Sequence, residues 1–312
     1  MNATCLARAR ASLSSVAGVA RALREAGREA HACWNEARWV LDDVRRQHRV
    51  PAHAALPPRA TQQVAEMLAR LARDEPIAYV LGTQPFGPID VQVRAPVLIP
   101  RPETESWALR VAAQLEASLR RVPRPMHIVD LCAGTGCVGL VLAHALRHVS
   151  DARVTLADHD PDALALCVAN RARAPCDSTR VAVQALDVWD ATAAAQLGAY
   201  DLLVCNPPYI AAHEHATLDA SVRAYESRRA LVGDTPNTDG LDYYRRLAEL
   251  LPRGYVRPTR DPALPFAVLE VGAGQAPAVV RLMREAGAGM FTTETWADEA
   301  GWQRVVALYT AE

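Results

Sequence analysis

The sequence has no apolar run long enough to cross a membrane, no closely spaced cysteine pair and no excess of basic charge. A membrane-spanning helix needs about 18 to 20 consecutive apolar residues, and no such run occurs, so we expect no transmembrane helix. None of the seven cysteines forms a C-x-x-C pair, and the nine histidines do not cluster beside them, so we expect no metal site. The odd number of unpaired cysteines is typical of reduced thiols in an intracellular protein. A net charge of −1 argues against a protein whose whole surface binds nucleic-acid phosphates and leaves a local basic groove as the alternative.

The first two dozen residues combine arginine and serine and contain no acid before Glu25. This composition is typical of a mitochondrial targeting segment, and it also fits a basic first helix of the folded protein. The arginines in question are Arg8, Arg10, Arg21 and Arg24. We therefore predict a mitochondrial location, with a cytoplasmic one as the alternative.

Three parts of the chain differ in the spacing of their apolar residues. Between residues 16 and 73 apolar residues recur every three or four positions, which predicts several short helices in a domain of residues 1–75. In residues 77–99 apolar residues instead alternate with polar ones, and Gly82 and Gly87 mark turns. This pattern predicts a linking β-hairpin over residues 76–100. The remaining residues, 101–312, form the main domain, where we expect Thr104 to cap a helix that ends near Pro123.

Residues 127–139 are typical of a strand, a glycine turn and the start of a helix. The turn contains G-x-G-x-x-G at Gly134, Gly136 and Gly139, a pattern that fits enzymes using dinucleotides as well as those using S-adenosylmethionine. Asp130 precedes the turn, where a carboxylate would repel a pyrophosphate but could hold the ammonium group of a methionine moiety. The glycines alone would also serve in a tight strand-to-helix turn.

A second strand, residues 154–157, ends at Asp158, where an acid is placed to accept hydrogen bonds from both ribose hydroxyls. Asp158 could instead cap the following helix. A third strand over residues 181–183 precedes Asp187, which could accept the adenine amino group, and Trp189, which could flank the ring. Strands and helices therefore alternate, which predicts an α/β domain with a doubly wound parallel sheet.

The most distinctive stretch is an apolar run, residues 201–205, that stops at Asn206, Pro207, Pro208 and Tyr209. The prolines fix their own φ angles and keep Asn206 extended at the carboxyl end of a strand, where open α/β sheets bind ligands. The Asn206 side-chain oxygen and the Pro207 carbonyl would then offer two acceptors to a planar NH2 group, with Tyr209 beside them. The alternative is a proline-rich turn in which Asn206 only helps to form the turn.

Together these motifs resemble a known family. D-L-C-A-G-T-G, the acid at Asp158 and N-P-P-Y resemble class I S-adenosylmethionine-dependent methyltransferases that act on a planar nitrogen. P-I-A-Y-V-L-G and V-L-I-P-R-P-E-T-E upstream narrow the resemblance to the HemK/PrmC family, the N5-glutamine methyltransferases that modify the GGQ motif of class 1 peptide-chain release factors. The resemblance covers nearly the whole chain from about Leu23.

The resemblance implies a Rossmann-like domain with a seven-stranded, mostly parallel sheet and a small N-terminal helical domain that helps to recognise the release factor. It implies S-adenosyl-L-methionine as cofactor and the GGQ loop as partner. By carry-over, Gly134, Gly136, Asp158 and Asp187 would bind the cofactor, and Asn206 with Pro207 would hold the glutamine amide.

The end of the chain looks more like eukaryotic, organellar relatives than like bacterial ones. The stretch from Pro252 to Phe266 looks longer than the corresponding stretch of the family, and we expect a surface loop there.

Two other functions fit parts of the sequence. An N6-adenine methyltransferase acting on nucleic acid would also use N-P-P-Y, since a flipped base presents a planar NH2 group. A catalytically silent protein could use the same fold to bind translation factors, although the acids and Asn206 are intact. A nicotinamide dehydrogenase would leave N-P-P-Y without a purpose. We expect a monomer that forms no stable complex with nucleic acid or membranes.

Overall fold

The computed structural model describes residues 13–121, 124–234, 237–251, 261 and 263–311, which fall into two compact units. The first unit comprises the chain up to Thr83 together with Asp219–Tyr225. The second comprises Gln84–Leu218 and Glu226 onwards. The first unit therefore includes a segment from late in the chain that the sequence patterns did not indicate.

The first unit is helical, as its apolar spacing predicted. Its long helices are α2 (Val16–Glu25), α3 (Ala30–His48) and α4 (Pro58–Leu71), and α10 (Ala220–Tyr225) joins it from the later segment. The Ser15 hydroxyl accepts a hydrogen bond from the Gly18 N–H at 3.2 Å and caps α2. Val19 and Leu23 of α2 are buried in the core of the unit. Part of the predicted targeting segment is thus a helix of the folded unit, and its first twelve residues lie outside the described part.

The predicted hairpin is wrong for its first half. Ile77–Leu81 forms a short helix, α5, which ends at Gly82 in the left-handed conformation. Only β1 (Thr83–Phe86) and β2 (Ile89–Gln92) form the two-stranded sheet. A run of five mostly apolar residues does not distinguish helix from strand, and Ile77, Val80 and Leu81 bury their side chains against the helical core.

The second unit contains a seven-stranded sheet in the order β5-β4-β3-β6-β7-β9-β8. Its strands are β3 (Met126–Leu131), β4 (Ala152–Asp158), β5 (Val181–Ala185), β6 (Leu202–Cys205), β7 (Ala267–Glu270), β8 (Phe291–Ala297) and β9 (Gln303–Thr310). The first five are parallel, and β9 runs antiparallel to both β7 and β8. This confirms the predicted mostly parallel sheet.

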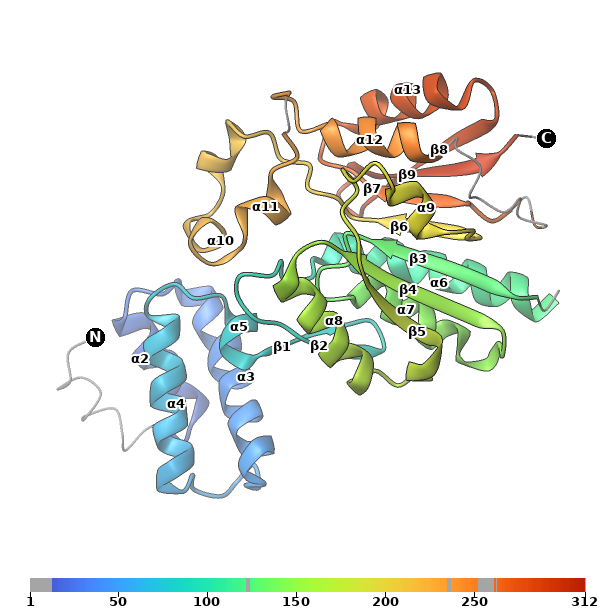
Figure 1. Ribbon diagram of the computed structural model, residues 1–312. Coiled ribbons are helices and arrows are strands. Elements are labelled where there is room, and N and C mark those ends of the chain that lie inside the picture. Colours follow the sequence, from blue (N-terminus) through green and yellow to red (C-terminus); the bar gives the residue numbers. More distant parts are fainter. Residues whose placement is uncertain (1–12, 122–123, 235–236, 252–260, 262, 312) are drawn as a thin grey trace. The chain divides into compact units, whose positions relative to one another are not determined.

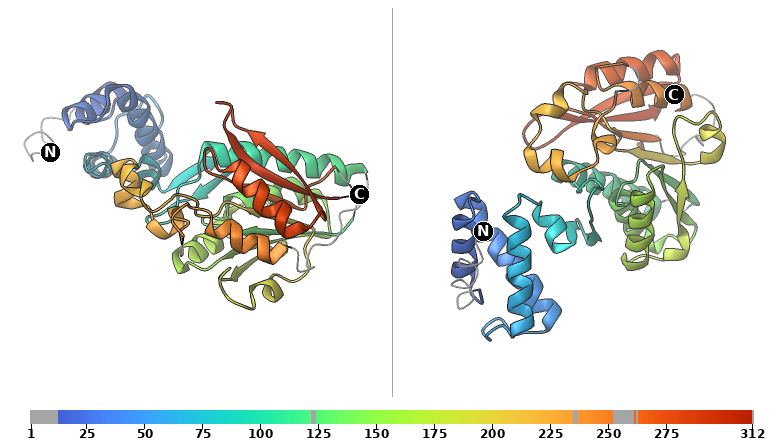
Figure 2. Two further views of the ribbon diagram at one scale, coloured as in Figure 1. Left: turned by 90° about the horizontal axis from the view of Figure 1, so that it is seen from above. Right: turned by 60° about the vertical axis from the view of Figure 1, so that its left-hand side comes forward.

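Helices cover both faces of this sheet (Figures 1 and 2). One face carries α6 (Pro102–Arg121), α7 (Cys137–Ala145) and α8 (Pro161–Arg173). The other carries α9 (Ala193–Leu197), α12 (Asp242–Leu250) and α13 (Ala276–Gly287), which share a core with alternate residues of the strands, such as Leu203 and Cys205 of β6. Side chains alternate along a strand, so the residues between them face α6 and α7.

The strand order places the functional residues at one edge. β3 lies between β4 and β6, so the chain winds in opposite directions on its two sides. The carboxyl ends of strands at such a reversal leave a crevice between the connecting loops, which is where open α/β sheets bind ligands. Asp130 and Asp158 lie among the last residues of β3 and β4, and Asn206 directly follows β6.

Within residues the structure describes, no helix is long and apolar enough to span a membrane.

Of the surface loop predicted over residues 252–266, residues 252–260 and 262 lie outside the described part. At its far end Leu264 and Phe266 are buried, so the prediction of a surface loop is wrong there; the Phe266 side chain belongs to the core beside β7.

Candidate active site

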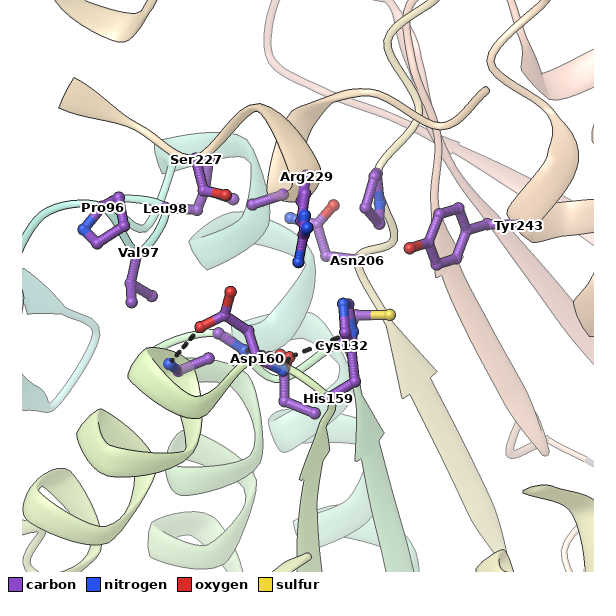
Figure 3. Close-up of a pocket in the computed structure, with 15 residues that line it drawn as sticks. Pro96, Val97, Leu98, Cys132, His159, Asp160, Asn206, Ser227, Arg229 and Tyr243 are labelled. Carbon is purple, nitrogen blue, oxygen red and sulfur yellow. Dashed lines mark hydrogen bonds and ion pairs between the residues drawn. The ribbon is translucent and has the colours of Figure 1, made fainter. Parts of the chain in front are cut away.

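A pocket open to solvent lies at the carboxyl ends of β3, β4 and β6. Figure 3 shows Asn206, Cys132, Asp160 and Tyr243 around it, with residues before α6 and from α11 (Arg228–Leu231) on its opposite side. Its lining comprises Pro96, Val97, Leu98, Cys132, Gly134, Asp158, His159, Asp160, Ala163, Asn206, Pro208, Ser227, Arg229, Ala230 and Tyr243. This concave lining, apolar with a few polar groups that converge on it, suits a small organic ligand.

Gly134 is the glycine that faces the cavity. It has a φ of +56°, and a Cβ added there would meet no protein atom within 4 Å. A ligand can therefore approach its backbone closely. Gly136 and Gly139 have a different role, since a Cβ would lie 2.9 Å from Leu156 Cδ1 at the first and 2.3 Å from Leu156 Cδ2 at the second. These two glycines let α7 pack against β4.

Asp130 lies behind the turn and does not line the cavity. Its side chain is 2% exposed, and its Oδ2 accepts a hydrogen bond from the Gly139 N–H at 2.7 Å. Burial raises the pKa of Asp130 to about 7, with the nearby Asp158 carboxylate adding to the shift. In this structure Asp130 joins β3 to the start of α7, whereas the sequence placed it against a methionine ammonium group.

Asp158 lies at the end of β4 and lines the cavity. Its Oδ2 accepts a hydrogen bond from the Gly134 N–H and its Oδ1 from the Asp160 N–H, both at 2.9 Å. Burial raises the pKa of this carboxyl group, and the two backbone donors oppose the shift. Each oxygen keeps a further acceptor position, so Asp158 can still accept hydrogen bonds from a diol. The alternative cap function belongs to Asp160, whose side chain accepts from the first turn of α8.

Asp187 and Trp189 lie beside the cavity and do not line it. The Asp187 carboxylate accepts the Trp189 N–H at 2.9 Å, and the Trp189 side chain is 40% exposed. The Trp189 ring meets the Tyr243 ring edge-on, with centroids 5.4 Å apart. Tyr243, from α12, does line the cavity, and the sequence patterns did not single it out. It provides the aromatic surface that we had expected from Trp189.

The Asn-Pro-Pro-Tyr corner begins directly after β6, which ends at Cys205. Asn206 and Pro208 line the cavity, whereas Pro207 and Tyr209 do not. The Tyr209 backbone carbonyl accepts a hydrogen bond from Gln275 Nε2 at 2.8 Å. The loop that follows is therefore held by a side chain from the start of α13.

Two glycines of a later segment pack directly on this corner. A Cβ at Gly233 would lie 2.4 Å from the Pro208 carbonyl oxygen, and one at Gly240 would lie 2.2 Å from the Tyr209 carbonyl oxygen. The Asp234 carboxylate accepts a hydrogen bond from the Gly240 N–H at 2.6 Å, which joins the two glycine positions. No side chain larger than hydrogen fits at either glycine without moving the corner.

Behind Asn206 lies a buried group of polar side chains. Asn206 Nδ2 donates to Thr104 Oγ1 at 3.2 Å, and the Thr104 hydroxyl donates to Glu270 Oε2 at 2.7 Å. Trp107 Nε1 donates to the same Glu270 oxygen at 2.7 Å. The prediction that Thr104 caps α6 is wrong, because this residue lies within the first turn and its hydroxyl is committed to Glu270. No local sequence signal could have identified a contact of this separation.

The opposite wall of the cavity is held by an ion pair. Arg101 Nη2 donates to both oxygens of the buried Glu226 carboxylate, at 2.8 and 2.7 Å. The Ser227 N–H donates to the Pro96 carbonyl at 2.7 Å. These bonds secure the start of α11, from which Arg229 points into the cavity (Figure 3). The sequence patterns assigned Arg229 no role, and it brings a positive charge to the cavity.

No group of three or more His, Cys, Asp or Glu side chains is placed to hold a metal ion in the part of the chain that the structure describes. The cavity lining offers carboxylates, an amide, the Tyr243 ring and the Arg229 guanidinium. These groups suit an organic ligand that carries hydroxyl and amino groups and a carboxylate.

Comparisons with known proteins agree with this chemistry. The family model described as Methyltransferase small domain matches residues 112–231. A release factor glutamine methyltransferase of Geobacter sulfurreducens is 33% identical over 278 residues, which cover 87% of each chain. The probable MRF1 mitochondrial N(5)-glutamine methyltransferase mtq1 of Schizosaccharomyces pombe is 34% identical over 218 residues, covering 67% of this chain and 68% of that one. The solved hMettl16 catalytic domain, in complex with a MAT2A 3′UTR hairpin, shares the fold with a TM-score of 0.50 and 14% identity, covering 80% of this chain and 82% of that one.

Proposed function

The chain belongs to the release factor glutamine methyltransferase family, and we propose that it methylates the side-chain amide nitrogen of the GGQ glutamine in a class 1 peptide-chain release factor. Relatives named release factor glutamine methyltransferase align with most of this chain, so the protein is an enzyme with the class I methyltransferase fold. The observation that carries the proposal is Asn206 at the cavity wall, directly after β6 and ahead of two prolines.

S-adenosylmethionine would bind in this cavity and would supply a methyl group on a positively charged sulfur, as the chemistry of the lining residues supports. Asp158 would accept the ribose hydroxyls, and the open space at Gly134 would take the part of the ligand that runs along the turn. Tyr243 would pack against an aromatic ring. Arg229 would pair with a carboxylate, such as that of the methionine moiety. Asp130 would act indirectly, by holding the turn in place through Gly139.

Asn206 and Pro207 would hold the reacting amide. The Asn206 Oδ1 and the Pro207 carbonyl are two acceptors, and a primary amide has two hydrogens to donate. Accepting both fixes the plane of the nitrogen and turns its remaining electron density towards the opposite side, where the methyl group would lie. Tyr209 would affect substrate binding only indirectly, by holding the position of its loop, because its side chain does not line the cavity.

The chemical difficulty is that an amide nitrogen is a weak nucleophile, since its lone pair is delocalised into the carbonyl. Acceptors on both N–H groups favour the positive charge that builds on nitrogen during attack, and they do so in a fixed geometry. After transfer the nitrogen carries an extra proton and is a strong acid, so water can take that proton. We therefore assign no residue as a general base.

A mitochondrial location is supported by the name of the fission yeast relative and by the arginine- and serine-containing start of this chain. We propose it for this protein, with a mitochondrial release factor as the substrate. Fractionation of cells that produce the full chain tests the location, and recovery in the cytosol alone would contradict it.

Methyl transfer from labelled S-adenosylmethionine tests the activity. The acceptors are a mitochondrial release factor, its GGQ Gln→Ala variant and duplex DNA, each with the wild-type enzyme and with Asn206→Ala. We expect label on the wild-type factor only, and a loss of at least 100-fold with Asn206→Ala. Equal labelling of the Gln→Ala factor, or labelling of DNA in its place, would overturn the proposal and favour an amino methyltransferase of nucleic acid.

A further inference from the structure

Asn206 does not stand alone at the cavity wall, because three buried polar side chains lie in a row behind it. Asn206 Nδ2 lies 3.2 Å from Thr104 Oγ1, which in turn lies 2.7 Å from Glu270 Oε2. The Thr104 side chain is 2% exposed and that of Glu270 is 1% exposed. Solvent therefore does not compete for these hydrogen bonds, and their direction is set by the side chains themselves.

The row follows from the sheet and one helix. Cys205 of β6 pairs with Leu269 of β7, so Asn206 and Glu270 are the next residues on two neighbouring parallel strands. The first turns of α6 run above these strand ends and supply Thr104 and Trp107, three positions apart and on one face of the helix. Thr104 thus fills the gap between the amide and the carboxylate.

With Glu270 ionised, the hydrogen bonds have one consistent direction; burial raises the pKa of this carboxyl group, and the hydrogen bonds from Trp107 and Thr104 oppose that shift. All three groups around the Glu270 carboxylate are donors: Trp107 Nε1 at 2.7 Å, the Thr104 hydroxyl at 2.7 Å and the Tyr209 hydroxyl at 3.5 Å. A hydroxyl has a single hydrogen, and at Thr104 that hydrogen is directed to Glu270. Only lone pairs of Thr104 then face Asn206.

A side-chain amide has two faces of opposite character, with NH2 on one side and a carbonyl oxygen on the other. Facing lone pairs, Asn206 must present its NH2 group to Thr104, and its Oδ1 must turn away. The flipped amide would set its oxygen against the oxygen of Thr104 and lose the hydrogen bond. In that orientation it would also offer a donor where an acceptor is needed.

We propose that Thr104 and Glu270 are positioning residues that hold the Asn206 amide with Oδ1 turned towards the substrate. This inference rests on the proposed function, because Oδ1 is the atom that would accept a hydrogen bond from the glutamine NH2 group. Neither residue touches the cavity, so both act through Asn206.

The test compares Thr104→Val and Thr104→Ser, each alone and combined with Asn206→Ala. Valine keeps the shape of threonine and removes the hydroxyl, whereas serine keeps the hydroxyl. Methyl transfer to the release factor is measured at saturating S-adenosylmethionine, and cofactor affinity is measured by calorimetry. Thr155→Val serves as a matched control, because Thr155 is a buried threonine of β4 that bonds His127 away from the cavity.

We expect Thr104→Val to lower kcat at least tenfold, with cofactor affinity within twofold of the wild type. Thr104→Ser should recover activity to within threefold, and Thr155→Val should leave kcat unchanged. In the Asn206→Ala background Thr104→Val should cause no further loss, because there is no amide left to orient. If Thr104 had only a structural role, the fold losses in kcat of Thr104→Val and Asn206→Ala would multiply in the double variant.

Glu270→Leu provides a second route if Thr104→Val folds poorly. Without the carboxylate the Thr104 hydrogen is free to point at Asn206 Oδ1, so kcat should fall again and the loss should again vanish in Asn206→Ala. Wild-type kcat in Thr104→Val, or multiplied losses in the double variants, would overturn the inference alone. A wild-type enzyme that fails to label the release factor would overturn the proposed function and the inference together.

Discussion

The two halves of the site are built in different ways. In the half that would hold the cofactor, the acids accept hydrogen bonds from backbone N–H groups of the glycine turn and the helix after it, Asp158 from Gly134 and Asp130 from Gly139. The half that would hold the substrate amide depends on contacts between distant parts of the chain, namely Asn206 with Thr104 and Thr104 with Glu270. In the first half backbone groups fix the acids, and in the second side chains fix one another.

This difference suggests how each half tolerates change. A carboxylate that accepts backbone N–H groups sets the shape of a turn, so substitutions there should act on folding and cofactor affinity together. A row of side chains sets the orientation of one amide, so substitutions there should act on turnover and spare cofactor affinity. Substitutions in the two halves can separate these effects.

The largest expected effect is a pH dependence of stability in the cofactor half. Burial raises the pKa of Asp130 from 3.8 to about 7, so the folded protein holds a proton that the unfolded chain releases above pH 4. Asp130 therefore costs stability as pH rises from about 4 to 7, by about 1.4 kcal/mol per pH unit and roughly 4 kcal/mol in total.

Asp130→Asn removes this titration and keeps an oxygen that can accept the Gly139 N–H. Urea unfolding of both proteins at several pH values gives the difference in their free energies of unfolding, in which groups common to both cancel. We expect the free energy of unfolding of the wild type minus that of the variant to fall as pH rises and to level off above pH 7. A difference that stays flat would show that Asp130 keeps its ordinary pKa.

The same contrast explains what the sequence could predict. The strand ends, the glycine turn and Asp158 were all identified, because each lies within one strand-turn-helix segment whose pattern is local. Thr104 was taken for a helix cap, because its partner Glu270 is 166 positions away. The first half of the predicted hairpin also failed, because burial against a separate helical core decided the conformation of residues 77–81.

Correctly predicted segments did not fix which side chains reach the cavity. Asp130 and Trp189 stay predicted ligand residues, and the cavity lining includes Cys132 and Tyr243, which the sequence patterns did not single out. Cys132 reaches the cavity because it is the first residue after β3 and begins the turn, whereas Asp130 is still within the strand and is buried beside α7. Tyr243 comes from α12, whose distance from β6 the sequence does not give.

The next largest effect is expected in the substrate half, at Gly240. Its Cβ in Gly240→Ala would lie 2.2 Å from the Tyr209 carbonyl oxygen, so the Asn-Pro-Pro-Tyr corner must shift. A displacement near 1 Å of a positioning group costs about 100-fold in turnover, and we expect that loss in kcat with cofactor affinity within threefold. Gly198→Ala is the matched control, because Gly198 also has a positive φ but no atom within 4 Å of its Cβ. Equal losses in both variants would mean that backbone strain, and not the collision, is responsible.

A smaller effect is expected at Gly134, where a substitution should change cofactor affinity and not turnover. Its added Cβ in Gly134→Ala would enter open space beside the cavity. We expect the Kd for S-adenosylmethionine, measured by calorimetry, to rise about tenfold, which is about 1.4 kcal/mol, while kcat at saturation changes little. Gly274→Ala shares the positive φ and the open surroundings but lies outside the cavity lining, and its Kd should stay at the wild-type value. Loss of kcat at saturation would show that the two halves are not separable at this turn.

The smallest effect is expected at Cys132, where the two halves meet. Cys132 follows β3, lines the cavity and has a φ of +59°, a conformation that costs a residue with a Cβ about 1 kcal/mol or more. Cys132→Gly removes that strain at the expense of a more flexible unfolded chain, so we expect the free energy of unfolding to rise by about 0.5 to 1 kcal/mol. Cys132→Ala removes the thiol and keeps the Cβ, so it should not be stabilised. If both variants respond equally in chemical unfolding, the thiol and not the backbone governs stability at this position.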